Sequence, residues 1–212
     1  MPLYPLFLKL DGRRCLVVGG GTVAARKVAS LLECGAIVEV VSPALCADLE
    51  QRAEAGDIAV TQRPFVAEDL DGATLAVAAT SLREVNEAVA ASARDRGIFV
   101  NVVDVPDLCD FYVPAHFARS DLQVAVCTGA AYPVLSKRLR IALEEQFGPE
   151  YAEYMAFLAR FRQEVKARVA DSHERARIET AFLDAPVLGL LSEGNRDEAE
   201  RVLAEWISQL PH

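Results

Sequence analysis

The stretch "CLVVGGGTVAARKVASLLECG", residues 15–35, constrains the fold most strongly. A short apolar run stops at three consecutive glycines, and apolar residues at near-helical spacing then continue until Gly35. Gly19, Gly21 and Ala24 match the G-x-G-x-x-A arrangement, in which the glycines allow a tight turn and the approach of a pyrophosphate to the backbone. A strand before this motif and a helix after it predict a dinucleotide site, with a ligand-free glycine turn as the alternative.

Strand and helix patterns alternate along the first half of the chain. After the glycine turn, strand patterns occupy residues 36–43, 57–65, 73–80 and 98–104, and helical patterns occupy 45–56 and 82–97. Such alternation predicts an α/β fold with a parallel sheet covered on both faces. Right-handed crossovers would make this sheet doubly wound and Rossmann-like.

The alternation of strand and helix patterns ends near Pro114. Two apolar runs, 111–117 and 121–130, are separated only by a polar turn, so we expect them to pair in antiparallel fashion. A helix begins at Pro133, and everything after Pro149 is helical, with Ser172 and Asn195 as expected capping residues. We therefore predict a nucleotide-binding domain over residues 1–113, a small β-rich dimerisation region over 114–148 and an all-helical C-terminal domain over 149–212. Apolar residues on both faces of the short strands predict a homodimer.

The composition narrows the classes of function. Hydrophobic residues make up 52% of the 212-residue chain, which is enough for a core, and the net charge of −9 argues against nucleic-acid binding. The five cysteines are scattered without a C-x-x-C pair, which indicates reduced thiols and a cytoplasmic protein. We expect no signal peptide and no membrane partner, because no apolar run is long enough to serve as either.

The second strand pattern lacks the usual ribose-binding acid. That acid is expected at the end of the strand, but the strand ends at Ser42, and Glu39 comes too early. We expect Ser42, or the backbone at Pro43 and Ala44, to hold the ribose instead. No Arg or Lys lies between Glu39 and Arg52 to bind a 2′-phosphate, which favours NAD over NADP.

Polar residues end the last two strand patterns of the first half. Asp104 follows the fifth pattern, where ligands of open α/β sheets bind, so it could accept a proton in catalysis; the alternative is a turn cap before Pro106. Thr80 ends the fourth pattern and either lines the nicotinamide site or caps the next helix. Asn101 either orients substrate or satisfies backbone groups.

Four motifs in order resemble the precorrin-2 dehydrogenase family, which includes the N-terminal module of siroheme synthase. They are "LFLKLDGRRCLVVGGGTVAARKVASLLECGAIVEVVSP", "LAVAATSLREVNEAV", "VNVVDVPDLCDFYVPA" and "LQVAVCTGAAYPVLSKRLRIALE". The resemblance implies a homodimer that oxidises precorrin-2 to sirohydrochlorin with NAD, and some members also insert ferrous iron. The matching positions imply NAD contacts at Thr22, Val23, Pro43 and Ala44 and a key carboxylate at Asp104. Members of the family carry a serine that can be phosphorylated at the position where this chain has Thr128. This departure leaves such regulation open.

The tetrapyrrole substrates carry many carboxylates, so basic groups and exposed N–H groups are candidate binding sites. Gly129, Lys137 and Arg138 lie in such a region, although for either cation alone a solvated helix face balanced by nearby acids is the favoured explanation. The three histidines lack metal-ligand spacing, so we expect no fixed metal site and at most a transient one at Asp104. Two alternatives stay open: a non-catalytic NAD(H)-sensing dimer, and a chelatase without dehydrogenase activity.

Overall fold

The computed structural model describes residues 3–211, which form two compact units. Unit 1 ends at Val113 and unit 2 begins at Pro114. No helix within residues 3–211 combines the length and the apolar character needed to cross a membrane.

Unit 1 contains a five-stranded sheet in which every neighbouring pair is parallel. Its strands are β1 (Arg14–Val18), β2 (Ile37–Val41), β3 (Ala59–Thr61), β4 (Leu75–Ala78) and β5 (Phe99–Val102), in the order β3-β2-β1-β4-β5. The strand order reverses beside β1, which pairs with β2 on one side and β4 on the other. The predicted doubly wound, Rossmann-like sheet is confirmed.

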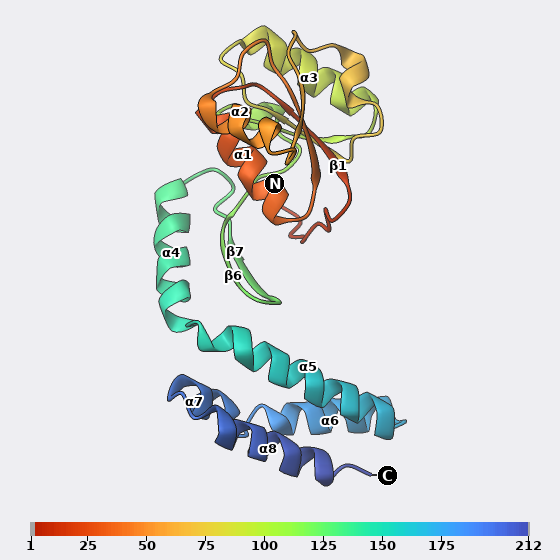
Figure 1. Cartoon of the computed structure of the whole chain (residues 1–212), viewed down its shortest axis with the longest axis vertical. Helices are drawn as coiled ribbons and strands as arrows, with labels where there is room; N and C mark the ends of the chain where they lie inside the picture. Colours follow the sequence, from red (N-terminus) through yellow and green to blue (C-terminus); the bar gives the residue numbers. More distant parts are fainter. Residues whose placement is uncertain (1–2, 212) are drawn as a thin grey trace. The chain divides into compact units, whose positions relative to one another are not determined.

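Helices cover both faces of this sheet (Figure 1). They are α1 (Thr22–Glu33), α2 (Ala47–Glu54) and α3 (Arg83–Asp95), with short 3₁₀ turns η1 (Ala67–Leu70) and η2 (Pro106–Leu108). Side chains of a strand alternate between faces, so Cys15 and Val17 of β1 pack with α1 and α2, whereas Leu16 and Val18 pack with α3 and η1. The apolar runs without alternation in the sequence are therefore strands buried on both faces.

Unit 2 begins with an antiparallel pair, β6 (Ala115–Arg119) and β7 (Leu122–Val126), which confirms the expected pairing. The helices α4 (Pro133–Gln146), α5 (Glu150–Arg168), α6 (Ser172–Phe182), α7 (Val187–Ser192) and α8 (Arg196–Ser208) follow. Their core is aromatic: the rings of Phe161 and Phe182 stack at 4.0 Å, and Trp206 meets both rings edge-on. These aromatic side chains form the hydrophobic core of the helical part of unit 2.

Several local expectations need correction. The residue that caps α6 is Asp171, whose carboxylate accepts a hydrogen bond from the Glu174 N–H at 2.8 Å, and Ser172 is already the first helical residue. Asn195 does occupy the N-cap position of α8, but its side chain makes no capping hydrogen bond within the described chain. The third strand is also shorter than its pattern. A division of unit 2 at residues 148 and 149 stays a prediction.

Candidate functional site

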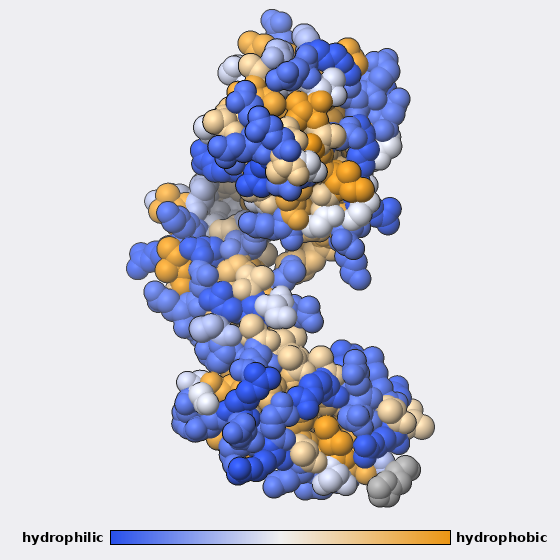
Figure 2. Space-filling view, viewed as in Figure 1, coloured by the Kyte–Doolittle hydropathy of each residue, from blue (hydrophilic) through white to orange (hydrophobic). Residues whose placement is uncertain are grey.

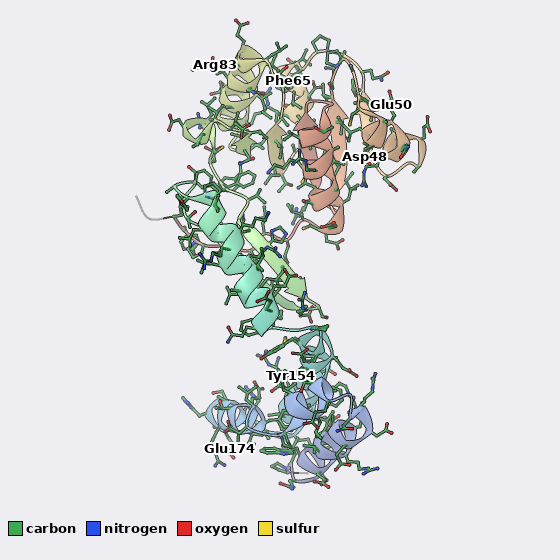
Figure 3. All side chains as sticks on the ribbon, turned by 90° about the vertical axis from the view of Figure 1, so that its left-hand side faces the viewer. Asp48, Glu50, Phe65, Arg83, Tyr154 and Glu174 are labelled. Atoms are coloured by element: carbon green, nitrogen blue, oxygen red, sulfur yellow. The ribbon has the colours of Figure 1, made fainter. Side chains whose placement is uncertain are left out.

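A cleft of about 1150 Å³ opens in unit 1 beyond the carboxyl ends of β1, β2, β4 and β5. This is the point where the strand order reverses, and open α/β sheets bind their ligands at such points. Figure 3 shows Phe65 and Arg83, which both line the cleft, at the same end of unit 1. The lining comes from residues 18–23, 41–46, 64–65, 79–86, 88 and 103–105.

The three glycines of the turn are constrained in three different ways. Gly19 has φ +128°, and a Cβ there would collide with the Ala79 carbonyl group of the β4 end. Gly20 leaves no room for a side chain, because a Cβ would overlap the Ala44 carbonyl oxygen and lie 2.7 Å from the Ser42 hydroxyl. Gly21 faces open space, because a Cβ there would meet no atom within 4 Å. The backbone at Gly21 is therefore accessible from the cleft, as an approaching pyrophosphate requires.

The start of α1 suits an anion. Gly21 is its N-cap residue, and within the described chain no side chain caps the helix and no acidic residue lies in the first turn. Thr22 and Val23 are the first helical residues and line the cleft. Their N–H groups have no intrahelical acceptor, and the helix dipole adds positive potential. The predicted motif thus has the geometry of a phosphate site.

The loop after β2 forms the neighbouring wall. Ser42, Pro43 and Ala44 all line the cleft, but the Ser42 hydroxyl donates a hydrogen bond to the Ala44 carbonyl at 2.8 Å and is buried. Ser42 therefore shapes the loop in this structure. Glu39 lies within β2, and its side chain forms an ion pair with Arg14 at 2.5 Å. Glu39 does not line the cleft.

The opposite wall follows β4. Thr80 lines the cleft, and its hydroxyl accepts a hydrogen bond from the Leu82 N–H at 3.1 Å. Asn86, which the sequence analysis did not single out, is buried on α3 and donates its amide to the Thr80 carbonyl at 3.0 Å. Its Oδ1 also accepts a hydrogen bond from the Thr80 hydroxyl at 2.8 Å. An Asn is a poor helix former, so its place within a helical pattern was the available signal.

Asp104 lies at the edge of the cleft after β5. Its φ of +60° falls in the left-handed region, which is uncommon outside glycine and is tolerated best by Asp and Asn. Asp104 is exposed, and no hydrogen bond or ion pair within residues 3–211 involves its carboxylate. The 3₁₀ turn that follows has Val105 as its N-cap and no side-chain capping bond. Asp104 therefore lines the cleft, and its carboxylate has no hydrogen-bond or ion-pair partner in the described chain.

Two neighbours of Asp104 were not predicted as functional residues. Lys27 is half-buried on α1; burial lowers its pKa, while the neighbouring Cys109 and Asp104 raise it. The Cys109 thiol has a raised pKa, mainly because of burial.

The remaining predicted residues lie elsewhere. Asn101 is buried, outside the cleft lining, and donates its amide to the Phe111 carbonyl at 3.0 Å. Unit 2 contains Gly129, with φ +62°, and the exposed Lys137 and Arg138. It also contains Thr128, whose hydroxyl lies 2.9 Å from that of Ser136. Contacts of these residues with substrate stay predictions.

Metal-binding side chains do not gather in the described chain. Within residues 3–211, no group of three or more His, Cys, Asp or Glu side chains is placed to hold a metal ion. His116 uses its Nδ1 on the Pro114 carbonyl at 3.0 Å, and His212 lies outside the described residues. A metal at Asp104 would need ligands from its substrate.

Known proteins resemble this chain over almost its whole length. A family model described as "Putative NAD(P)-binding" matches residues 6–115, and one described as "Sirohaem synthase dimerisation region" matches residues 150–207. The chain belongs to this NAD(P)-binding family. The siroheme synthase of Methylococcus capsulatus is 42% identical over 97% of this chain, and the match covers 43% of that protein. The siroheme synthase of Chromobacterium violaceum is 41% identical over 98% of this chain, and the match covers 44% of that protein. The chain thus spans less than half the length of the curated relatives it matches.

A solved structure shares the architecture. The structure titled "SirC, precorrin-2 dehydrogenase" superposes with a TM-score of 0.76 at 28% sequence identity, covering 96% of this chain and all of that one. The resemblance predicted from the sequence, to precorrin-2 dehydrogenases and the N-terminal module of siroheme synthase, is confirmed by these matches.

Proposed function

We propose that this chain is an NAD-dependent dehydrogenase that oxidises precorrin-2 to sirohydrochlorin in siroheme biosynthesis. One observation carries the proposal: a single cleft joins an anion-binding glycine turn to the unpartnered carboxylate of Asp104. The similarity to a precorrin-2 dehydrogenase along its entire length, and to siroheme synthases, supports the choice of substrate.

The glycine turn and the loop after β2 would hold the dinucleotide. The open backbone at Gly21 and the N–H groups of Thr22 and Val23 suit the pyrophosphate. Pro43 and Ala44 offer backbone to the adenosine side. No Lys or Arg side chain of the described residues 41–46 is available for a 2′-phosphate, which favours NAD over NADP.

Asp104 would act as the general base. NAD+ bound in the cleft supplies the hydride acceptor for the dehydrogenation. Removal of a hydride from precorrin-2 leaves a proton to be lost, and an exposed carboxylate without competing partners can accept it. The positive φ fixes the direction in which the Cα–Cβ bond of Asp104 leaves the backbone.

Incubation of the purified protein with precorrin-2 and NAD+ should produce NADH, followed by its absorbance. Asp104→Asn keeps a side chain that tolerates the left-handed conformation and removes only the ionisable group. We expect this variant to lose about 100-fold in kcat, within the range for general bases, while NAD+ affinity changes less than about twofold. Asp107→Asn, three positions further on and outside the cleft, is the matched control and should retain activity.

Two further measurements, sirohydrochlorin binding and ferrous-iron insertion, separate the alternatives. A non-catalytic NAD(H)-sensing dimer would bind NAD(H) but neither form NADH nor bind sirohydrochlorin. A chelatase would insert ferrous iron into sirohydrochlorin without NAD+. Because the described chain holds no fixed cluster of metal ligands, such insertion would have to use Asp104 together with the macrocycle nitrogens, and Asp104→Asn would abolish it.

We further propose that the protein acts as a cytoplasmic homodimer. All five cysteines are free, as expected in a reducing compartment. Around α4, large apolar side chains are exposed, including Val134 at 71% and Tyr132 at 63%, and Figure 2 shows hydrophobic surface there. One family model that matches the helical part is described as a dimerisation region. Sedimentation at micromolar concentration should give a dimer, and a monomer would contradict the proposal.

A further inference from the structure

The turn that carries Asp104 is closed by a backbone hydrogen bond, in which the Val105 N–H donates to the Val102 carbonyl at 3.3 Å, and by contacts with the sulfur of Cys109. Strand β5 is at the edge of the sheet, and its inner side pairs with β4. Its outer side is covered by the returning residues 109–111. The Val100 N–H donates to the Asp110 carboxylate at 3.1 Å, and the Asp110 N–H donates to the Val100 carbonyl at 2.8 Å. This return brings Cys109 beside the end of β5.

Four polar groups converge on the Cys109 sulfur. It accepts hydrogen bonds from the Val102 N–H at 3.2 Å and from the Asn101 amide at 3.5 Å. Its S–H faces the Val102 carbonyl at 3.1 Å and the Val105 carbonyl at 3.4 Å and can donate to either. Because Val102 and Val105 flank Asp104 on both sides, one sulfur spans the turn in which Asp104 adopts its positive φ.

Nothing else in the described chain fixes the carboxylate of Asp104. Its own side chain makes no hydrogen bond or ion pair within residues 3–211, so its position depends on the backbone of the turn. A free cysteine commonly acts as a small apolar filler, but here its sulfur makes polar contacts. Burial raises the pKa of this thiol, which keeps it in the S–H form that can donate.

We propose that Cys109 is a positioning residue, whose thiol holds the turn from Val102 to Val105 so that Asp104 points into the cleft. The inference rests on the proposed dehydrogenase function for its kinetic consequence, but the structural part does not depend on it. Loss of the thiol should let the turn relax from the strained conformation and misplace the carboxylate, and misplacement of about 1 Å can cost up to about 100-fold in rate.

The test compares Cys109→Ala, Cys109→Ser and the exposed-cysteine control Cys34→Ala in the full chain. We expect Cys109→Ala to lower kcat for NADH formation about 10-fold or more, with NAD+ affinity within about twofold of wild type. Cys109→Ser keeps a donor and an acceptor and should restore most of the loss. In the Asp104→Asn background, Cys109→Ala should cause no further loss, because both changes act through the same carboxylate.

Amide hydrogen exchange of residues 102–105 provides a readout that is independent of activity. We expect faster exchange by about 10-fold or more in Cys109→Ala and no change in Cys34→Ala, since only the first removes an acceptor of this turn. Unchanged exchange in Cys109→Ala would overturn the inference, whether or not the wild-type protein is active. Faster exchange with wild-type kcat would also overturn it, because the turn would then not control Asp104. A wild-type protein that forms no NADH contradicts the proposed function alone.

Discussion

Gly20→Ala tests whether the glycine turn is packed as tightly as the structure indicates. A Cβ at this position would overlap the Ala44 carbonyl oxygen and lie 2.7 Å from the Ser42 hydroxyl and 2.9 Å from the Ala44 carbonyl carbon. The atom that the Cβ would overlap belongs to the backbone of Ala44, which cannot rotate away. The loop after β2 must move instead.

The movement would break two hydrogen bonds. The Cys46 N–H donates to the Gly20 carbonyl at 2.7 Å, and the Ser42 hydroxyl donates to the Ala44 carbonyl at 2.8 Å. Each such bond contributes about 1 kcal/mol, and overpacking adds about 1–3 kcal/mol. We therefore expect Gly20→Ala to lower the free energy of unfolding by about 3–5 kcal/mol and Tm by about 10–15 °C.

Gly21→Ala is the matched control, because it adds the same methyl group one residue later. That Cβ would enter open space, and φ at Gly21 is −86°, which alanine adopts readily. The free energy of unfolding should change by less than about 1 kcal/mol. NAD+ affinity should nevertheless fall at least about 10-fold, because the methyl group occupies the approach of the pyrophosphate.

Thermal unfolding and isothermal titration with NAD+ measure both effects. A wild-type Tm for Gly20→Ala would show that the loop after β2 is not packed on the glycine turn. Wild-type NAD+ affinity for Gly21→Ala would place the dinucleotide elsewhere. The two variants together separate stability from binding in adjacent residues.

Contacts outside the turn give three further predictions. Arg63 lowers the pKa of Asp69 through a hydrogen bond. The stability that this carboxylate contributes is therefore fully present above its unfolded pKa of about 4. It is lost as the pH falls through the lower pKa of the folded state. Asp69→Asn should therefore lower Tm at pH 7 and weaken the acid-dependent fall in Tm. Burial raises the pKa of Cys15 to about 11, so a thiol reagent at pH 8 should modify the exposed Cys34 quickly and Cys15 only after unfolding, as mass spectrometry of labelled peptides would show. Asn86→Ala removes the buried amide that holds the end of β4 and should cost about 2–3 kcal/mol in urea denaturation; a loss below about 0.5 kcal/mol would contradict that role.

The parallel, doubly wound sheet could be predicted from the sequence, and the residues expected to bind the dinucleotide do line one cleft. Apolar runs between helical patterns are sufficient to predict a parallel sheet, and the glycine motif marks the point where ligands bind. Asp104 was predicted because it follows the last of these runs. Each inference depends on residues close together in the chain.

Contacts between distant residues could not be predicted in this way. Nothing in "GGG" shows that Gly20 packs on Ala44, since this depends on how the loop after β2 folds back. Cys109 has the composition of a core filler, and its polar role appears only when the chain returns along β5. The cap of α6 was assigned one residue too late because aspartate and serine are both favoured at that position.

The return of residues 109–111 along β5 also protects the sheet from other chains. An edge strand with unpaired N–H and C=O groups is a template for further strands and hence for aggregation. Here the carboxylate of Asp110 and the sulfur of Cys109 occupy the outward N–H groups of Val100 and Val102. The opposite edge is β3, which has only three residues and offers little length for pairing. The segment that we propose to position Asp104 therefore also helps to prevent strands of other chains from pairing with the sheet of unit 1.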